Sequence, residues 1–207
     1  KKGVTFDNSR ETLKQLPHQL IMTATPIPRT LAMSSYADLD FSIIDELPTG
    51  RKPIETTVIN SHRRADVIKR VASACALGRQ AYWVCTLIEE SESIANQAAE
   101  VVAGELKLLL PKLNIGLLHG RLRADKKINV MNKFREGEIN LLVATTVIEV
   151  GVDIPNASLI IIENSERLGL SQLHQLRGRV GRGADRSHCV LLYNSPLSNE
   201  GKERLKM

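Results

Sequence analysis

Cysteine is scarce in this chain: only three of its 207 residues are cysteines, and no two of them form a Cys-x-x-Cys pair. Zinc ribbons and disulfide-stapled scaffolds need cysteines at short, regular spacings, so both classes are excluded. Isolated thiols are typical of proteins kept in a reducing compartment. We therefore expect a cytoplasmic protein.

Long apolar runs are missing as well. The most apolar stretch, residues 159–162, is far shorter than the roughly 18 residues that a membrane-spanning helix needs. The sequence begins Lys1-Lys2-Gly3-Val4, which lacks the apolar core of a signal peptide. We expect no membrane contact, and because the first residue is not Met we expect a piece of a longer protein.

Aromatic residues number only seven: three Phe, three Tyr and one Trp. Proteins that grip single strands by base stacking need more aromatic side chains than this on one face, so any nucleic-acid contact should be to phosphates. The formal net charge is +5, and residues 121–207 alone carry 14 positive and 10 negative side chains. A net charge of this size fits nucleic-acid binding and an ordinary solvated surface equally well.

The chain also has no Gly-x-x-x-x-Gly-Lys-[Ser/Thr] loop. The backbone N–H groups of that loop cradle a triphosphate, and its Lys and hydroxyl residues serve the phosphates and Mg²⁺. We therefore expect that no part of this chain cradles a nucleoside triphosphate by itself.

From residue 54 onward, short apolar runs alternate with longer segments of helical period. The runs are rich in Val, Ile and Leu without strict polar alternation, which is typical of strands buried on both faces. They predict strands at residues 54–59, 80–85, 115–119, 139–145, 158–163 and 189–193. Repeated strand–helix–strand units predict an α/β fold with a parallel sheet covered by helices on both faces.

Three helices are predicted between these strands, over residues 63–77, 93–110 and 124–136. The apolar stripes expected to face the sheet are Ile94, Ala98, Val101, Val102, Leu106 and Leu109 in the second helix and Ala124, Ile128, Met131 and Phe134 in the third. A stretch rich in Pro and Gly around residues 47–53 indicates a domain boundary. We expect residues 1–50 to end a preceding domain, residues 51–195 to form a domain of their own, and residues 196–207 to begin a C-terminal helical segment.

The most informative segment is residues 172–183, in which Arg177, Arg179 and Arg182 stand between glycines. Guanidinium groups bind phosphate oxygens through a planar fork of donors, and glycine lets the backbone approach a partner closely. Four leucines precede the arginines at helical spacing: Leu168, Leu170, Leu173 and Leu176. We therefore expect an ordered helix that delivers the arginines to a fixed place. Beside a parallel sheet, the expected ligand is a nucleotide phosphate at the carboxyl ends of the strands.

Five stretches match, in order, the motifs of superfamily 2 helicases and translocases. Gln175-x-x-Gly178-Arg179-x-x-Arg182 resembles motif VI of that superfamily. The other matches, for motifs III, IV, IVa and V, are residues 23–25, 83–87, 118–121, and 144–146 together with 151–153. Their order over about 160 residues makes chance an implausible explanation. The resemblance implies a RecA-like, P-loop NTPase-like fold: the second helicase lobe, without a phosphate loop.

Within the superfamily, the chain resembles the RecG family most closely. Residues 23–32 and 169–179 are similar to both RecG and the transcription-repair coupling factor Mfd. Residues 86–92, 117–122, 162–169 and 192–198 look like RecG. The resemblance implies a DNA motor that remodels stalled replication forks and Holliday junctions. The corresponding lobe of Mfd and a non-catalytic RecA-like module that binds DNA or a partner protein are the alternatives.

The resemblance implies a role in ATP hydrolysis for five residues. Arg182 is the implied arginine finger at the γ-phosphate, with Arg179 beside it and Gln175 as a positioning residue. Gly151 and Asp153 are implied to contact ATP. Taken alone, Asp153 is better explained as a turn residue before Ile154-Pro155, and its place in the motif reverses that preference.

DNA contacts are implied at Thr86, His119, Gly120, Arg121 and Thr145. Thr145 ends a predicted strand, with hydroxyl and backbone donors suited to a phosphate oxygen. Gly120 and Arg121 follow another strand, with backbone N–H groups and a cation. Taken alone, a histidine at a strand end is usually structural, so His119 depends on the motif.

The motif III match implies that Thr23 and Thr25 couple the nucleotide state to the grip on DNA; taken alone, they suit a capped turn. ATP and Mg²⁺ are the implied cofactors. Mg²⁺ would be held by a first RecA-like lobe, because its Asp-Glu-x-His/Asp carboxylates have no counterpart here. Branched or forked DNA and that first lobe are the implied partners of a monomeric parent associated with the bacterial nucleoid. We expect this chain alone to hydrolyse ATP no faster than background.

Overall fold

In the computed structural model of the chain, the residues described are 42–44, 46, 52–86, 92–145, 154–183 and 186–205. The chain divides into two compact units, residues 1–41 and 42–207, and all described residues belong to the second. The division expected from the sequence at residues 50 and 195 remains a prediction.

The second unit alternates strands and helices along the chain. Its elements, in order, are β1 (Glu55–Asn60), η1 (Ser61–Arg63), α2 (Arg64–Ala76), β2 (Gln80–Cys85), α3 (Glu92–Leu109), β3 (Ile115–Leu118), α4 (Ala124–Arg135), β4 (Leu141–Ala144), β5 (Ala157–Glu163), η2 (Ser165–Arg167), α5 (Leu170–Arg177), β6 (His188–Tyr193) and α6 (Asn199–Arg204).

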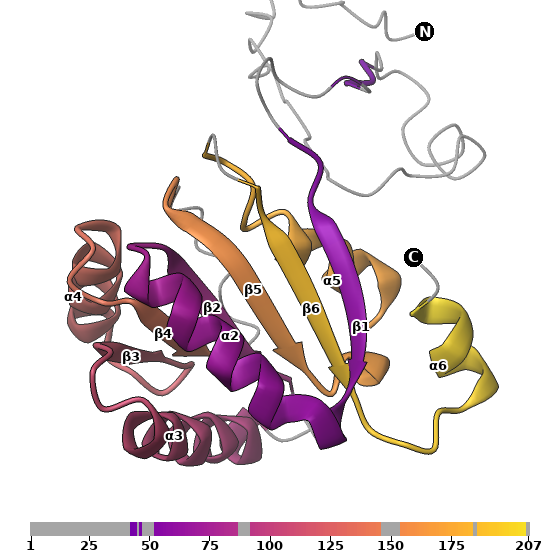
Figure 1. Ribbon diagram of the computed structural model, residues 1–207, viewed down its shortest axis with the longest axis horizontal. Coiled ribbons are helices and arrows are strands. Elements are labelled where there is room, and N and C mark those ends of the chain that lie inside the picture. Colours follow the sequence, from indigo (N-terminus) through magenta and orange to yellow (C-terminus); the bar gives the residue numbers. More distant parts are fainter. Residues whose placement is uncertain are drawn as a thin grey trace, which may run out of the picture. The chain divides into compact units, whose positions relative to one another are not determined.

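The strands form one six-stranded sheet in the order β1-β6-β5-β2-β4-β3, and every neighbouring pair is parallel (Figure 1). The predicted α/β fold is thereby confirmed, and each predicted strand overlaps an observed one. The inner strands β2 and β4 are buried along their whole length. This is why their sequences show no polar alternation.

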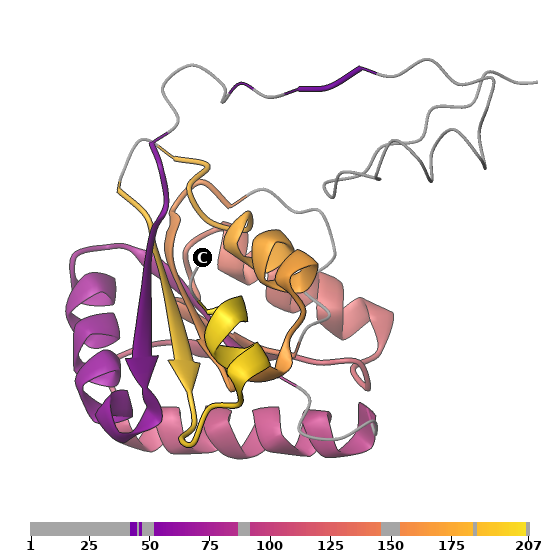
Figure 2. The same ribbon diagram turned by 90° about the vertical axis from the view of Figure 1, so that its right-hand side faces the viewer.

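Helices cover both faces of the sheet, as Figure 2 shows for α2 on one side of β1 and β6 and α5 on the other. The core on the first face is built mainly from α2, α3 and alternate sheet residues; its largest side chain is Trp83. The core on the second face joins α4, α5 and α6 to the other sheet residues, and there Tyr82 packs edge-on against Phe134 at 5.0 Å between ring centroids. Neighbouring strand residues thus serve opposite cores.

The apolar stripes expected for α3 and α4 were wrong at three positions, since Val101, Leu109 and Ile128 are exposed. In α3 the predicted Leu106 is buried, and the rest of the buried face is formed by small residues: Ala95, Ala99 and Ala103. These positions recur at helical spacing, so they fix which side of the helix faces the sheet. Leu170 in α5 is likewise exposed, while Leu173 and Leu176 are buried.

The carboxyl ends of parallel strands share one edge of a sheet, and loops at that edge commonly bind ligands. Here the loops after β2, β3 and β4 begin with Thr86, His119 and Thr145. The topology therefore brings three of the predicted DNA contacts to the same edge.

Candidate functional site

The motif VI residues lie on α5 and on the turn that follows it. Gln175 is exposed on the helix, which ends at Arg177. Arg179 and Arg182 therefore lie beyond the helix, in a segment that we call the arginine turn (residues 178–183). Backbone bonds continue into it, because the Arg179 N–H donates to the Leu176 carbonyl at 3.0 Å.

Buried and tightly packed residues fix the arginine turn. Val180, which stands between Arg179 and Arg182 in the sequence, is completely buried. Gly181 adopts φ +79°, a left-handed conformation that other residues rarely adopt. A Cβ atom on Gly181 would lie 2.8 Å from the Cγ1 atom of Ile54, and one on Gly183 would collide with the Pro155 carbonyl oxygen. These two glycines serve close packing against the rest of the domain.

This anchored turn carries two arginine side chains. Arg179 is half-buried and Arg182 is exposed, with its Nε donating to the Gly178 carbonyl at 3.4 Å. Nη2 of Arg177 lies 3.0 Å from Nδ1 of His174. A guanidinium can only donate, so Nδ1 is the acceptor in this contact. His174 is thus a neighbour of Arg177 within the helix.

A second group of predicted residues gathers where β3 and β4 end. Residues 119–121 form a loop whose middle residue is held from two helices. The Gly120 N–H donates to Oδ1 of Asn96 on α3 at 3.2 Å, and its carbonyl accepts from Nζ of Lys127 on α4 at 2.8 Å. The Gly120 N–H is thus already bonded to Asn96, and a DNA contact at Gly120 stays a prediction.

His119 and Thr145 are buried at this edge, with 5% and 3% of their surface exposed. The Thr145 N–H donates to the Leu118 carbonyl at 3.2 Å, so the two strand ends remain side by side. Nε2 of His119 lies 3.4 Å from a carboxylate oxygen of Glu100 on α3. Arg121 is the exposed member of the group.

Thr86 lies at the end of β2, and 1% of its surface is exposed. Its hydroxyl donates to the Glu163 carbonyl oxygen at 2.9 Å, joining the ends of β2 and β5. The side chain therefore lies inside the edge, where it supports neighbouring loops rather than offering its proton to a ligand.

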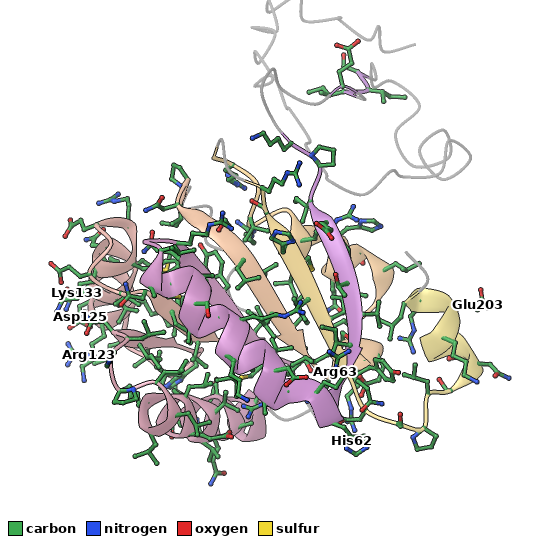
Figure 3. All side chains as sticks on the ribbon, viewed as in Figure 1. His62, Arg63, Arg123, Asp125, Lys133 and Glu203 are labelled. Atoms are coloured by element: carbon green, nitrogen blue, oxygen red, sulfur yellow. The ribbon has the colours of Figure 1, made fainter. Side chains whose placement is uncertain are left out.

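Positive charge concentrates on α4 and the loop before it. Residues 121–135 contain six Lys and Arg side chains and one Asp, a net of +5. Figure 3 shows Arg123 and Lys133 projecting outward from α4, and Lys126 between them is also exposed. The charge excess that the sequence assigned to the last third is thus strongest beside the loop of residues 119–121.

A half-buried cation, Arg64, was not predicted from the sequence. Arg64, the first residue of α2, donates from Nε to Glu163 at 2.5 Å and from Nη1 to Glu105 at 2.7 Å, and its guanidinium lies 5.2 Å from the Trp83 ring centroid. Burial lowers the pKa of Arg64, but hydrogen bonds and attraction to the two carboxylates outweigh burial and raise it. No local pattern could reveal this cluster, because its partners are 19 to 99 residues away.

Four predicted site residues lie outside the described part of the chain: Thr23, Thr25, Gly151 and Asp153. Within the described residues, no helix is long and apolar enough to span a bilayer. The same residues include no group of three or more His, Cys, Asp or Glu side chains that could hold a metal ion.

Comparison with known proteins agrees with this geometry. Residues 64–184 match the family model described as the helicase conserved C-terminal domain. The chain therefore belongs to the helicase C-terminal domain family, whose fold is the RecA-like second lobe.

The resemblance to RecG is confirmed by its relatives. The chain is 68% identical over 192 residues to the ATP-dependent DNA helicase RecG of Escherichia coli strain K12, which covers 92% of this chain and 28% of that protein. It is 47% identical over 194 residues to RecG of Bacillus subtilis strain 168, covering 93% and 28%. The chain thus spans little more than a quarter of these relatives.

A solved structure of RecG bound to a three-way DNA junction matches with a TM-score of 0.74 and 43% identity, covering 88% of this chain and 24% of that one. The helicase Lhr from Mycobacterium smegmatis, bound to single-stranded DNA and AMP-PNP, matches with a TM-score of 0.54 and 17% identity, covering 69% of this chain and 20% of that one. The second likeness shows the fold alone.

Proposed function

We propose that this chain is the second RecA-like lobe of an ATP-dependent DNA helicase of the RecG type, which remodels branched DNA such as stalled replication forks and Holliday junctions. One observation carries the proposal: two arginines are anchored on a rigid turn in a chain that has no phosphate loop. Arginines held in this way can contact the phosphates of a nucleotide that is bound by another lobe. Relatives named ATP-dependent DNA helicase RecG support the same assignment.

Phosphoryl transfer from ATP spreads negative charge over the γ-phosphoryl oxygens, and a guanidinium inserted from a second domain stabilises that charge. We assign Arg182 as this finger, Arg179 as a second cation and Gln175 as a positioning residue. Gly151 and Asp153 would contact the nucleotide. Mg²⁺, which neutralises charge on the bound phosphates, would be held by the first lobe.

For DNA we assign the loop of residues 119–121, with Arg121 as its exposed cation, together with the basic surface of α4. Thr145 directly follows β4, the strand beside the one that leads into this loop, and Thr86 would support the same edge of the sheet at the end of β2. Thr23 and Thr25 would couple ATP hydrolysis to this grip. The parent would act as a monomer on branched DNA in the bacterial cytoplasm, at the nucleoid.

The test is ATP turnover by the full-length protein with forked DNA. We expect Arg182→Ala to lower DNA-stimulated turnover by at least roughly 10³-fold, the lower end of the roughly 10³–10⁵-fold effects of arginine fingers. Arg186→Ala, an exposed arginine just outside the motif, is the matched control and should leave turnover unchanged. Turnover that survives Arg182→Ala, or that this chain supports alone, would overturn the proposal.

A further inference from the structure

Three of the polar side chains on helix α3 are bonded to residues at the carboxyl edge of the sheet. Asn96 accepts from the Gly120 N–H, Glu100 pairs with His119, and Glu105 pairs with Arg64. None of the three belongs to a helicase motif recognised in the sequence. The helix therefore touches the edge at points that the motif matches do not explain.

Asn96 is the least expected of the three. It is 1% exposed, and its buried neighbours on the same helix face are Ala95, Ala99 and Ala103. Alanine forms helices better than asparagine, and a buried amide is costly unless it is hydrogen-bonded. The bond to the Gly120 N–H is the compensating interaction that the structure offers at this position.

The buried polar side chains at this loop have only some of their hydrogen-bonding atoms paired. Among the described residues, three buried polar atoms of these side chains have no hydrogen-bond partner: Nδ2 of Asn96, Nδ1 of His119 and Oγ1 of Thr145. Unpaired buried polar atoms destabilise a fold. A residue chosen for packing alone at position 96 would be apolar, so the asparagine points to a task in the loop.

We infer that α3 positions the loop of residues 119–121 through Asn96 and Glu100, and so sets where Arg121 meets a DNA phosphate. The inference rests on the proposed DNA-motor function and deepens it. Asn96 and Lys127 hold the two peptide groups that flank the Gly120 Cα atom, and Glu100 holds the ring of His119. Both α3 residues act through the loop, and neither needs to touch DNA.

The test uses the full-length protein and measures ATP turnover against the concentration of forked DNA. A positioning role predicts that Asn96→Ala raises the KM for DNA about three- to tenfold, the value of one hydrogen bond, with kcat changed less than twofold. Gln97→Ala, the exposed neighbour on the same helix, is the matched control. Because Asn96 is buried, Glu100→Ala is measured in parallel: that side chain is 52% exposed, so its removal leaves the core closed.

A double-mutant cycle with Arg121→Ala separates positioning from mere stabilisation. If Asn96 and Glu100 act through Arg121, their substitutions should have little further effect on the KM for DNA once Arg121 is gone. Additive effects in both cycles, or an unchanged KM in both single variants, would overturn the inference. A wild-type protein whose ATP turnover ignores DNA would instead refute the proposed function itself.

Discussion

Gly181 lies in the middle of the arginine turn, and its replacement by alanine tests how that turn is built. Two independent features oppose a side chain there. The backbone has φ +79°, and a Cβ atom would lie 2.8 Å from Cγ1 and 3.1 Å from Cδ1 of Ile54. Gly178, three residues earlier, has φ −66° and a nearest Cβ contact of 3.4 Å, so it is the control within the same motif.

The two features give separate contributions to the expected loss of stability. A non-glycine residue in the left-handed region costs about 1–2 kcal/mol. Forcing a methyl group against Ile54 costs about 1–2 kcal/mol more, in the lower part of the range for overpacked sites, because the isoleucine tip can shift by a few tenths of an ångström. We therefore expect Gly181→Ala to lower the free energy of unfolding by about 2–4 kcal/mol, which lowers Tm by about 5–12 °C. At Gly178, alanine should be neutral or slightly stabilising, since the residue has helical dihedral angles.

Urea unfolding of the two variants and the wild type, followed by circular dichroism, measures both changes. The expected result is a large shift of the midpoint for Gly181→Ala with an unchanged slope, and no shift for Gly178→Ala. Equal midpoints for the two variants would refute the packing argument, because the same chemical change would then have the same effect in both environments.

Three further predictions concern other parts of the domain. Burial raises the pKa of all three cysteine thiols, to about 11 for Cys75 and about 12 for Cys189, against an ordinary 9.0. Native protein at pH 8 should therefore not react with a thiol reagent until urea unfolds it. The stability that these protonated thiols give should be complete below pH 9 and decline as the pH rises through 11 to 12. Arg64→Lys keeps the charge but loses the forked geometry, and should lower the free energy of unfolding by about 1–2 kcal/mol in urea titration. The control Arg63→Lys, at an exposed ion pair, should change it by less than about 0.5 kcal/mol. Equal effects of the two substitutions would contradict the role of the forked guanidinium. If α4 contacts DNA phosphates, Lys126→Ala should reduce the log–log salt slope of single-strand binding by about 0.7, and an unchanged slope would remove α4 from the interface.

The sheet could be predicted because its information is local. Each strand is a short run of Val, Ile and Leu bounded by turn residues, and parallel strands buried on both faces need nothing else to be recognised. The burial of α3 could not be predicted in the same way. Its buried face is mostly alanine, while the larger apolar residues Val101 and Leu109 are exposed, so a stripe chosen by hydrophobicity was right at Leu106 and wrong at those two positions.

The features of the predicted site likewise divide into those with a local sequence signal and those without one. Matching motifs located the loop of residues 119–121, because glycine and arginine stand next to each other in the sequence. The partners that hold the loop, Asn96 and Lys127, come from two separate helices and show no local signal. Thr86 was expected to face DNA, and only its contact with the Glu163 carbonyl reveals that the hydroxyl is engaged. Such engagement depends on strand order, which a sequence pattern does not contain.

The anchoring of the arginine turn leads to a last prediction, which separates the two kinds of residue within it. Ile54 and Pro155, against which Gly181 and Gly183 pack, each lie within two residues of the start of a strand, β1 and β5. The turn is therefore held by the sheet at two points and does not depend on α5 alone. A displacement of about 1 Å in a catalytic group can cost about 10²-fold in rate.

Gly183→Ala, which changes no charge, should consequently lower both the stability of the domain and the ATP turnover of the full-length protein. Its Cβ atom would meet the Pro155 carbonyl oxygen, and a backbone group cannot move aside as a side-chain tip can. Arg182→Ala, at an exposed side chain, should lower turnover alone and change the free energy of unfolding by less than about 0.5 kcal/mol. Turnover measured beside urea unfolding for both variants makes the comparison. If Gly183→Ala lost stability but kept full turnover, the position of the turn would not control the arginine, and the finger would have to be held by the other lobe instead.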